Sequence, residues 1–162
     1  MKLHFRERIF TWFDSYDVHD ENHKLVYRVK GQLSWGHKLV IFNSKGERVG
    51  VVTQKIVTLL PKYEIEAKGE SLGFIKKNLT LINPHYDFDK LGWHAKGNFV
   101  KWNYKIVDDK GDIVAKIDKK LIHLTDNYVI DVPEKKNALK ALMFVIAIDA
   151  EQCAQEKREN KG

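Results

Sequence analysis

The sequence predicts a mainly β domain of about twelve short strands, folded as a sandwich or barrel around one hydrophobic helix near the C-terminus. Two observations carry this prediction. Short stretches rich in Tyr, Val, Ile and Lys alternate with Gly and Asp turns over most of the 162 residues. The run ALKALMFVIAIDA (138–150) is instead apolar on every side except at Lys140 and Asp149. We expect one domain over 1–162, with strands from about 3 to 132 and a helix from about 138 to 156.

The predicted helix is the core of the fold. A helix that is apolar all round must be enclosed by protein or by lipid. A bilayer span needs about 20 apolar residues, whereas a run of about 10 to 14 is typical of a buried core helix. Pro133 ends the strands, and Asn137 is placed to cap the helix N-terminus. The side chains predicted to fill the core are Leu139, Leu142, Met143, Phe144, Val145, Ile146 and Ile148.

A loose repeat organises the strands. Each unit is a strand, a turn, a second strand and, in the clearest cases, a basic end. Lys45-Gly46, Lys68-Gly69 and Lys110-Gly111 mark turns, where glycine supplies the positive φ that tight hairpins require. Six hairpins give about twelve strands, and the segment IFTWF (9–13) is predicted to be a first strand. The residues that open the six units are Tyr16, Leu39, Tyr63, Tyr86, Tyr104 and Tyr128.

Composition bounds the location and the partners. The formal net charge is +6, which suits an anionic partner but also describes a well-solvated basic surface. Cys153 is the only cysteine, so no internal disulfide forms. The N-terminal sequence MKLHFRERIF carries charges where a signal peptide needs an apolar run. We therefore expect a cytoplasmic monomer with no transmembrane segment and no cofactor.

The motifs that would indicate an enzyme do not occur in the sequence. There is no GxGxxG or GxxxxGK[ST] loop, no HExxH motif and no paired-cysteine zinc spacing. The segment DVHDENH (17–23) comes closest to a metal cluster, but a hairpin turn accounts for it because Asp and Asn bond locally to the backbone. The seven histidines show no triad spacing. We predict a protein that is not an enzyme, and we assign no catalytic or metal-binding residue.

Basic residues gather at the predicted strand ends. Neighbouring residues on a strand face opposite sides, so a lysine doublet at a strand end places charge at the rim. Such rims can combine into a patch for phosphate groups, or the lysines can simply protect strand edges. Trp12, Trp35, Trp93 and Trp102 either add base stacking or lie in the core. The candidate anion-binding residues are Lys55, Lys62, Lys76, Lys77, Lys119 and Lys120.

Three segments resemble a known family. QKIVTLLPKYEI (54–65) followed by GESLGFIKKNLTLINPHYDF (69–88) is similar to the LURP-one-related proteins and their small bacterial YxjI-type relatives, which belong with phospholipid scramblases and the tubby C-terminal domain. TDNYVIDVPEKKNALKALMFVIAIDAE (125–151) is similar to the end of a scramblase. The resemblance implies a closed barrel of about twelve strands with the C-terminal helix threaded through its centre. It also implies an intracellular protein with relatives that bind phosphoinositides or are linked to membrane lipid movement.

These observations lead to one functional hypothesis and two alternatives. The first is a non-enzymatic cytoplasmic barrel that binds an anionic lipid head group or a similar phosphorylated ligand. The second is a nucleic-acid-binding barrel that uses the basic rim and the tryptophans. Nucleic acid is a less favoured partner than an anionic lipid or phosphorylated ligand. The third is a scaffold with no small ligand.

Overall fold

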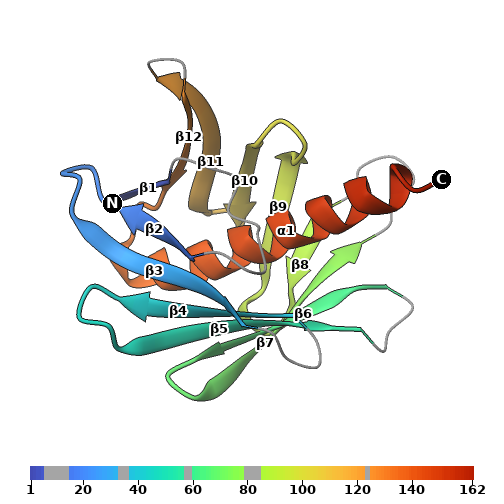
Figure 1. The fold of residues 1–162 in the computed structure, drawn as a ribbon, viewed down its shortest axis with the longest axis horizontal. Coiled ribbons are helices and arrows are strands. Elements are labelled where there is room, and N and C mark those ends of the chain that lie inside the picture. The colour runs from blue at the N-terminus through green and yellow to red at the C-terminus, as the bar shows by residue number, and fades with distance from the viewer. Residues whose placement is uncertain (6–14, 33–36, 57–59, 79–84, 123–124) are drawn as a thin grey trace.

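Twelve antiparallel strands close into a barrel around one long helix in the computed structural model of the chain (Figure 1). The structure describes residues 1–5, 15–32, 37–56, 60–78, 85–122 and 125–162. It confirms the predicted barrel with an enclosed C-terminal helix. The predicted first strand over 9–13 lies outside the described residues.

The strands follow one another around the barrel in chain order, and β1 returns to pair with β12. Strands that are consecutive in the sequence are therefore also neighbours in the barrel, as expected of an up-and-down barrel. The bounds are β1 (Lys2–Phe5), β2 (Ser15–His19), β3 (Leu25–Gln32), β4 (Lys38–Asn43), β5 (Arg48–Lys55), β6 (Lys62–Ala67), β7 (Glu70–Asn78), β8 (His85–Phe88), β9 (Trp93–Asn98), β10 (Asn103–Val107), β11 (Ile113–Ile122) and β12 (Thr125–Asp131).

The hairpin turns use the chemistry that the sequence indicates. Gly46, Gly69 and Gly111 all have positive φ, between 81° and 87°. Two of these turns are closed further by a side chain at the strand end. Asn43 accepts from the backbone N–H groups of residues 45 and 47, and Asp108 does the same for residues 110 and 112. These local bonds fix the turns and therefore the register of the flanking strands.

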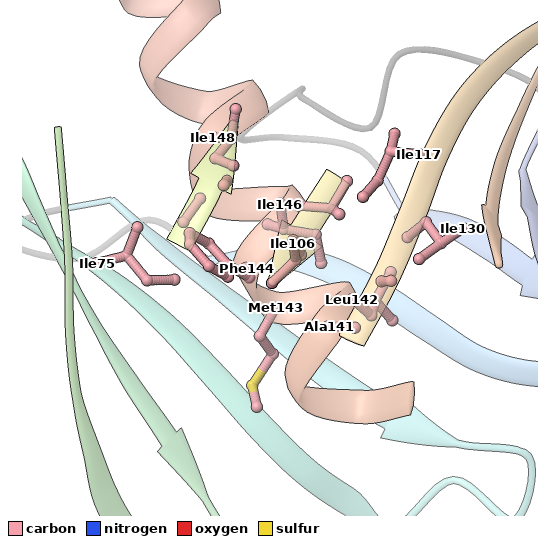
Figure 2. Packing of buried hydrophobic residues seen from close by; sticks show 14 of the residues in the cluster. Ile75, Ile106, Ile117, Ile130, Ala141, Leu142, Met143, Phe144, Ile146 and Ile148 are labelled. Atoms are coloured by element: carbon pink, nitrogen blue, oxygen red, sulfur yellow. The ribbon is translucent and has the colours of Figure 1, made fainter. Parts of the chain in front are cut away.

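Helix α1 (Ala138–Glu159) fills the barrel. Ala141, Leu142, Met143, Phe144, Val145, Ile146 and Ile148 are at most 1% exposed. Figure 2 shows helix residues such as Leu142 and Phe144 among isoleucines of the surrounding strands, including Ile75 and Ile130. The predicted core residues are thus buried, except that Leu139, in the first turn, is only partly buried.

The start of α1 differs from the prediction in one respect. Asn137 does occupy the N-cap position, but its side chain makes no capping hydrogen bond. The cause is its backbone, which is already helical at φ −92° and ψ −5°, because a 3₁₀ turn over Lys135–Asn137 leads directly into the helix. The helix also continues to Glu159, three residues beyond the predicted end at Glu156.

The sequence repeat corresponds to a ring of inward-facing side chains. Tyr63, Tyr86 and Tyr104 are each the second residue of an even-numbered strand, and all three are buried. The C-terminal half of α1 meets them: the Tyr63 hydroxyl donates to Glu151 at 3.2 Å, and Gln152 donates to the Tyr86 hydroxyl at 2.9 Å. We call this end of the barrel, where the even-numbered strands begin and α1 ends, the exit end.

Burial of charge in the helix was not predicted from the sequence. Glu151 is 2% exposed and Asp149 is 1% exposed. Desolvation raises the pKa of the Glu151 carboxyl, while Arg158, at 3.1 Å, opposes that shift. The buried tyrosine and the arginine at the helix end therefore allow a polar residue to continue an otherwise apolar core helix.

Candidate functional site

Three of the predicted lysines form a row across the outer wall of the exit end. Lys62 lies directly opposite Lys55 on β5 and opposite Lys76 on β7. Each of the three has a compensating neighbour. Lys55 Nζ lies 2.6 Å from Glu64, Lys76 Nζ lies 3.4 Å from Asp89, and Lys62 Nζ lies 4.6 Å from the centre of the Phe74 ring. We call Lys55, Lys62 and Lys76 the balanced row.

The other three predicted lysines do not join this row. Lys77 has the opposite orientation to Lys76 and donates to Gln155 of α1 at 2.7 Å. Burial lowers the pKa of its ammonium group. Lys119 and Lys120 lie on β11, and Figure 1 shows the β11–β12 hairpin well away from β5–β7. The predicted set is thus divided between two walls of the barrel and its interior.

A second row of three lysines crosses strands β9, β10 and β11. Lys105 lies directly opposite Lys96 on one side and Lys116 on the other. All three are exposed, whereas Ala95, Ile106 and Ile117 beside them in sequence are buried, so the row faces outward. Within the described part of the chain, none of these three ammonium groups makes an ion pair. We call Lys96, Lys105 and Lys116 the groove row.

The groove row lines a shallow groove of about 410 Å³. Asn103 adds an amide to the same surface, and Asp118 places one carboxylate at its edge. Gly97 shapes this region because β9 and β10 approach closely there. A Cβ at Gly97 would lie 2.7 Å from the Asn103 carbonyl oxygen, and the backbone φ of +139° also favours glycine. The groove therefore presents three cations and neutral donors around a single carboxylate.

The turn at residues 99–102 closes the β9–β10 hairpin beside the groove. Phe99 and Trp102 are 6% and 4% exposed, and their rings pack in the aromatic cluster of the exit end. Trp102 has a φ of +53°, which is unusual for a residue other than glycine. Its N–H donates to Phe99 O at 3.2 Å, and the Lys101 N–H donates to the Asn98 side chain at 3.0 Å.

The tryptophans that the structure describes are core residues. Trp93 is 7% exposed and packs edge-on against Phe88, and Trp102 is buried as described above. Neither offers a ring face to a nucleic acid base. Trp12 and Trp35 lie outside the described residues.

His94 joins two carboxylates in a polar cluster on the surface. Its Nδ1 lies 2.7 Å from Asp87 and its Nε2 lies 2.8 Å from Asp109. These two carboxylates raise the pKa of the imidazole. The cluster joins β8 and β9 to the turn between β10 and β11, which makes it a clasp between hairpins.

The segment 17–23, which comes closest to a metal cluster in the sequence, forms a hairpin turn and not a metal site. Among the described residues, no group of three His, Cys, Asp or Glu side chains is arranged to hold a metal ion. His19 ends β2, while His23 lies in the following turn with a φ of +61°. The turn is held by Asp20, which accepts from the N–H groups of residues 22 and 24. The turn interpretation of this segment thus has a direct structural basis.

Comparison with known proteins places the fold in a family. The LURP-one-related family profile matches residues 1–149. The chain belongs to the LURP-one-related family. It is similar to the uncharacterized protein YxjI of Bacillus subtilis (strain 168), with 23% identity over 150 residues, which covers 92% of each chain. The solved structure of the Arabidopsis thaliana protein AT5G01750 is also similar, with a TM-score of 0.64 and 18% identity over 93% of this chain and 91% of that one.

The family assignment establishes the fold but names no ligand for this LURP-one-related protein. Among the described residues, no helix combines the length and the apolarity needed to cross a membrane. The groove row was not predicted from the sequence, although a signal for two of its three lysines is present. Lys105 and Lys116 are equally distant from the Lys110-Gly111 turn, and in a regular hairpin such residues face each other.

Proposed function

We propose that this protein is a non-enzymatic barrel that binds a phosphorylated anionic ligand in the groove over Lys96, Lys105 and Lys116. One observation carries the proposal: these three lysines face one another in register, and within the described residues no carboxylate pairs with them.

The energetic argument begins with repulsion. Like charges directly opposite each other on neighbouring strands destabilise a sheet. Side chains directly opposite have Cβ atoms about 5 Å apart, so Lys105 has a like-charged neighbour on each side. An anion placed over the row removes that repulsion and gains charge-assisted hydrogen bonds. The unliganded protein is therefore destabilised by repulsion between these lysines, and a bound phosphate relieves that repulsion.

The shape of the groove supports a small, multiply charged ligand. A lysine ammonium is a compact point charge with three donors that adapt to several phosphate oxygens. Asn103 supplies a neutral amide on the same surface, and Asp118 bounds the groove with a negative charge. Phosphate oxygens fit over the row, whereas they are repelled at the Asp118 edge.

Titration calorimetry with inorganic pyrophosphate tests the proposal. Lys96→Ser/Lys105→Ser/Lys116→Ser should weaken pyrophosphate binding about a hundredfold, since each lysine near an anionic surface contributes on the order of 1 kcal/mol. The control is Lys45→Ser/Lys68→Ser/Lys110→Ser, which removes the same charge from exposed turns at the other end of the barrel. Equal binding by the two triple variants would contradict the proposal.

The two alternatives predict different results. A nucleic-acid-binding barrel should bind single-stranded DNA far more tightly than pyrophosphate, although Trp93 and Trp102 are too buried to stack on bases. A scaffold with no small ligand should show no saturable heat with pyrophosphate. Either result would replace the proposed function.

A further inference from the structure

Large apolar side chains that reach solvent are few among the described residues. Val100 is the most exposed at 71%, followed by Ile56, Leu60 and Ile113. Single exposed apolar residues are common on protein surfaces. Val100 differs from such cases by its place at the tip of a hairpin and by its neighbours.

The turn that presents Val100 is held in place on both sides. Phe99 and Trp102 anchor it in the aromatic cluster, where Trp102 lies 5.9 Å from the Phe5 ring and 4.4 Å from the Tyr128 ring. The left-handed backbone of Trp102 is unfavourable for a bulky residue. That conformation turns the indole inward and leaves Val100 and Lys101 as the outward residues of the turn. The exposed valine is thus fixed by structure.

Cations surround this apolar tip on the same hairpin. Lys101 is adjacent in sequence and exposed, and the groove row begins at Lys96 and Lys105, one outward-facing position beyond the Asn98–Asn103 pair. Figure 1 shows the β9–β10 hairpin extending past α1, with its turn above the helix in this view. An apolar tip followed by a basic surface is the arrangement with which peripheral proteins contact membranes, because one signal alone gives only marginal attachment.

We propose that the β9–β10 hairpin docks on an anionic phospholipid bilayer, with Val100 inserted at the interface and the groove row on head-group phosphates. This inference rests on the proposed function, since it assigns the groove's ligand to a lipid. The attraction is complementary in charge: lysines near an anionic leaflet are drawn to it within a Debye length of the surface. Val100 adds the apolar contact that a soluble phosphate does not offer.

Vesicle co-sedimentation separates this inference from the proposed function. The vesicles contain phosphatidylcholine with or without phosphatidylserine. Val100→Ser should weaken binding to the phosphatidylserine vesicles about fivefold, because a partly inserted valine loses its apolar transfer energy. It should leave pyrophosphate binding unchanged. Val100→Leu should strengthen vesicle binding, and Ile113→Ser, an exposed apolar residue at the opposite end of β10–β11, should change neither.

Each other outcome is decisive. Wild-type vesicle binding by Val100→Ser would overturn the docking proposal while leaving the groove as a site for a soluble anion. A loss caused by Ile56→Ser and not by Val100→Ser would move the docking surface to the β5–β6 connection and also overturn it. If the Lys96→Ser/Lys105→Ser/Lys116→Ser variant binds both vesicles and pyrophosphate as the wild type does, the proposed function itself fails.

Discussion

Two rows of three lysines cross the outer wall of this barrel, and they differ in what lies beside them. In the balanced row, Glu64 and Asp89 pair with two of the lysines, and Phe74 lies beneath the third. In the groove row, Lys105 faces Lys96 and Lys116, and Asp118 is the only carboxylate that lines the groove. Asp131 on β12 lies opposite Lys116, but its carboxylate pairs with Lys2. Among the described residues, the same register of like charges thus occurs once with ion pairs to carboxylates and once without them.

The difference shows how local geometry, more than lysine content, sets the availability of charge. Asp89 belongs to a 3₁₀ turn over Asp89–Leu91, which brings its carboxylate back over β7, where it also accepts the Phe74 N–H at 2.8 Å. The β9–β10 turn next to the groove row contains no carboxylate, and Asp109 of the β10–β11 turn reaches back to His94 and not to a lysine. A solvent-exposed ion pair contributes little to stability, but it does occupy a cation that an anion would otherwise contact.

Removal of the compensating carboxylates should turn the balanced row into an anion site. Glu64→Gln/Asp89→Asn, introduced into the Lys96→Ser/Lys105→Ser/Lys116→Ser background, should strengthen pyrophosphate binding about tenfold by titration calorimetry, because two lysines lose their partners. The amides keep the hydrogen bonds to Ser71 and to the Phe74 N–H. Glu66→Gln/Glu70→Gln removes the same charge elsewhere and serves as the control. No gain would mean that carboxylate pairing is not what distinguishes the rows.

Removal of the carboxylate that lines the groove should strengthen anion binding by the groove row. Asp118→Asn keeps the shape of the groove and removes the one negative charge that lines it. Pyrophosphate binding to the otherwise wild-type protein should become about fivefold tighter, in keeping with one nearby unit charge at the protein surface. Asp112→Asn, in the distant β10–β11 turn, should leave the affinity unchanged. Weaker binding by Asp118→Asn would place the ligand elsewhere.

Stability should respond to the two rows with opposite signs. Lys105→Gln relieves repulsion from two neighbours and should raise the free energy of unfolding by about 0.5 kcal/mol. Lys76→Gln breaks its pair with Asp89 and should lower it by a few tenths of a kcal/mol, roughly the worth of an exposed ion pair. Urea denaturation of both variants measures the difference. Destabilisation by Lys105→Gln would show that the groove row is already compensated without a ligand.

The balanced row continues through Asp87 to His94, and this end should show a small pH dependence. The pKa of His94 is raised by Asp87 and Asp109. The clasp therefore stabilises the fold fully below the ordinary histidine pKa near 6.5, and this contribution is lost as the pH rises through the higher folded value. Because the pair is partly exposed, the change should be below about 1 kcal/mol.

The difference in unfolding free energy between the wild type and His94→Gln isolates this contribution. It excludes the contribution of His4, whose pKa is lowered by burial, so that its stabilisation is lost as the pH falls. Urea denaturation at about pH 6 and about pH 9 is sufficient for the comparison. Gly92→Ala should act like His94→Gln, because a Cβ at Gly92 would overlap the Asp109 carboxylate and displace it. An unchanged difference across this range would mean that the clasp does not stabilise the fold.

The fold was largely predictable from the sequence because its signals are local. The glycines at 46, 69 and 111 mark turns by their backbone freedom, and the apolar run from Ala138 can be buried only inside a closed structure. The inward tyrosines Tyr63, Tyr86 and Tyr104 also recur at intervals of 23 and 18 residues. Each of these features is visible in a short stretch of chain.

The candidate site was less predictable because it depends on register between strands. Position at a strand end indicates which lysines lie at the rim, and the register places Lys55, Lys62 and Lys76 in one row. Position in the sequence does not show the Glu64 and Asp89 carboxylates beside them. Lys96 and Lys116 come together only through pairing of both with β10. Whether the six rim lysines bind an anion therefore stays a prediction alongside the groove row.

The two rows can be compared most directly by nuclear magnetic resonance on the isotope-labelled full chain during titration with pyrophosphate. We expect the backbone amides around Lys96, Lys105 and Lys116 to shift together and to saturate, while those around Lys55, Lys62 and Lys76 stay in place. Shifts confined to β5–β7, or spread evenly over all exposed lysines, would contradict the assignment of the anion site to the groove row.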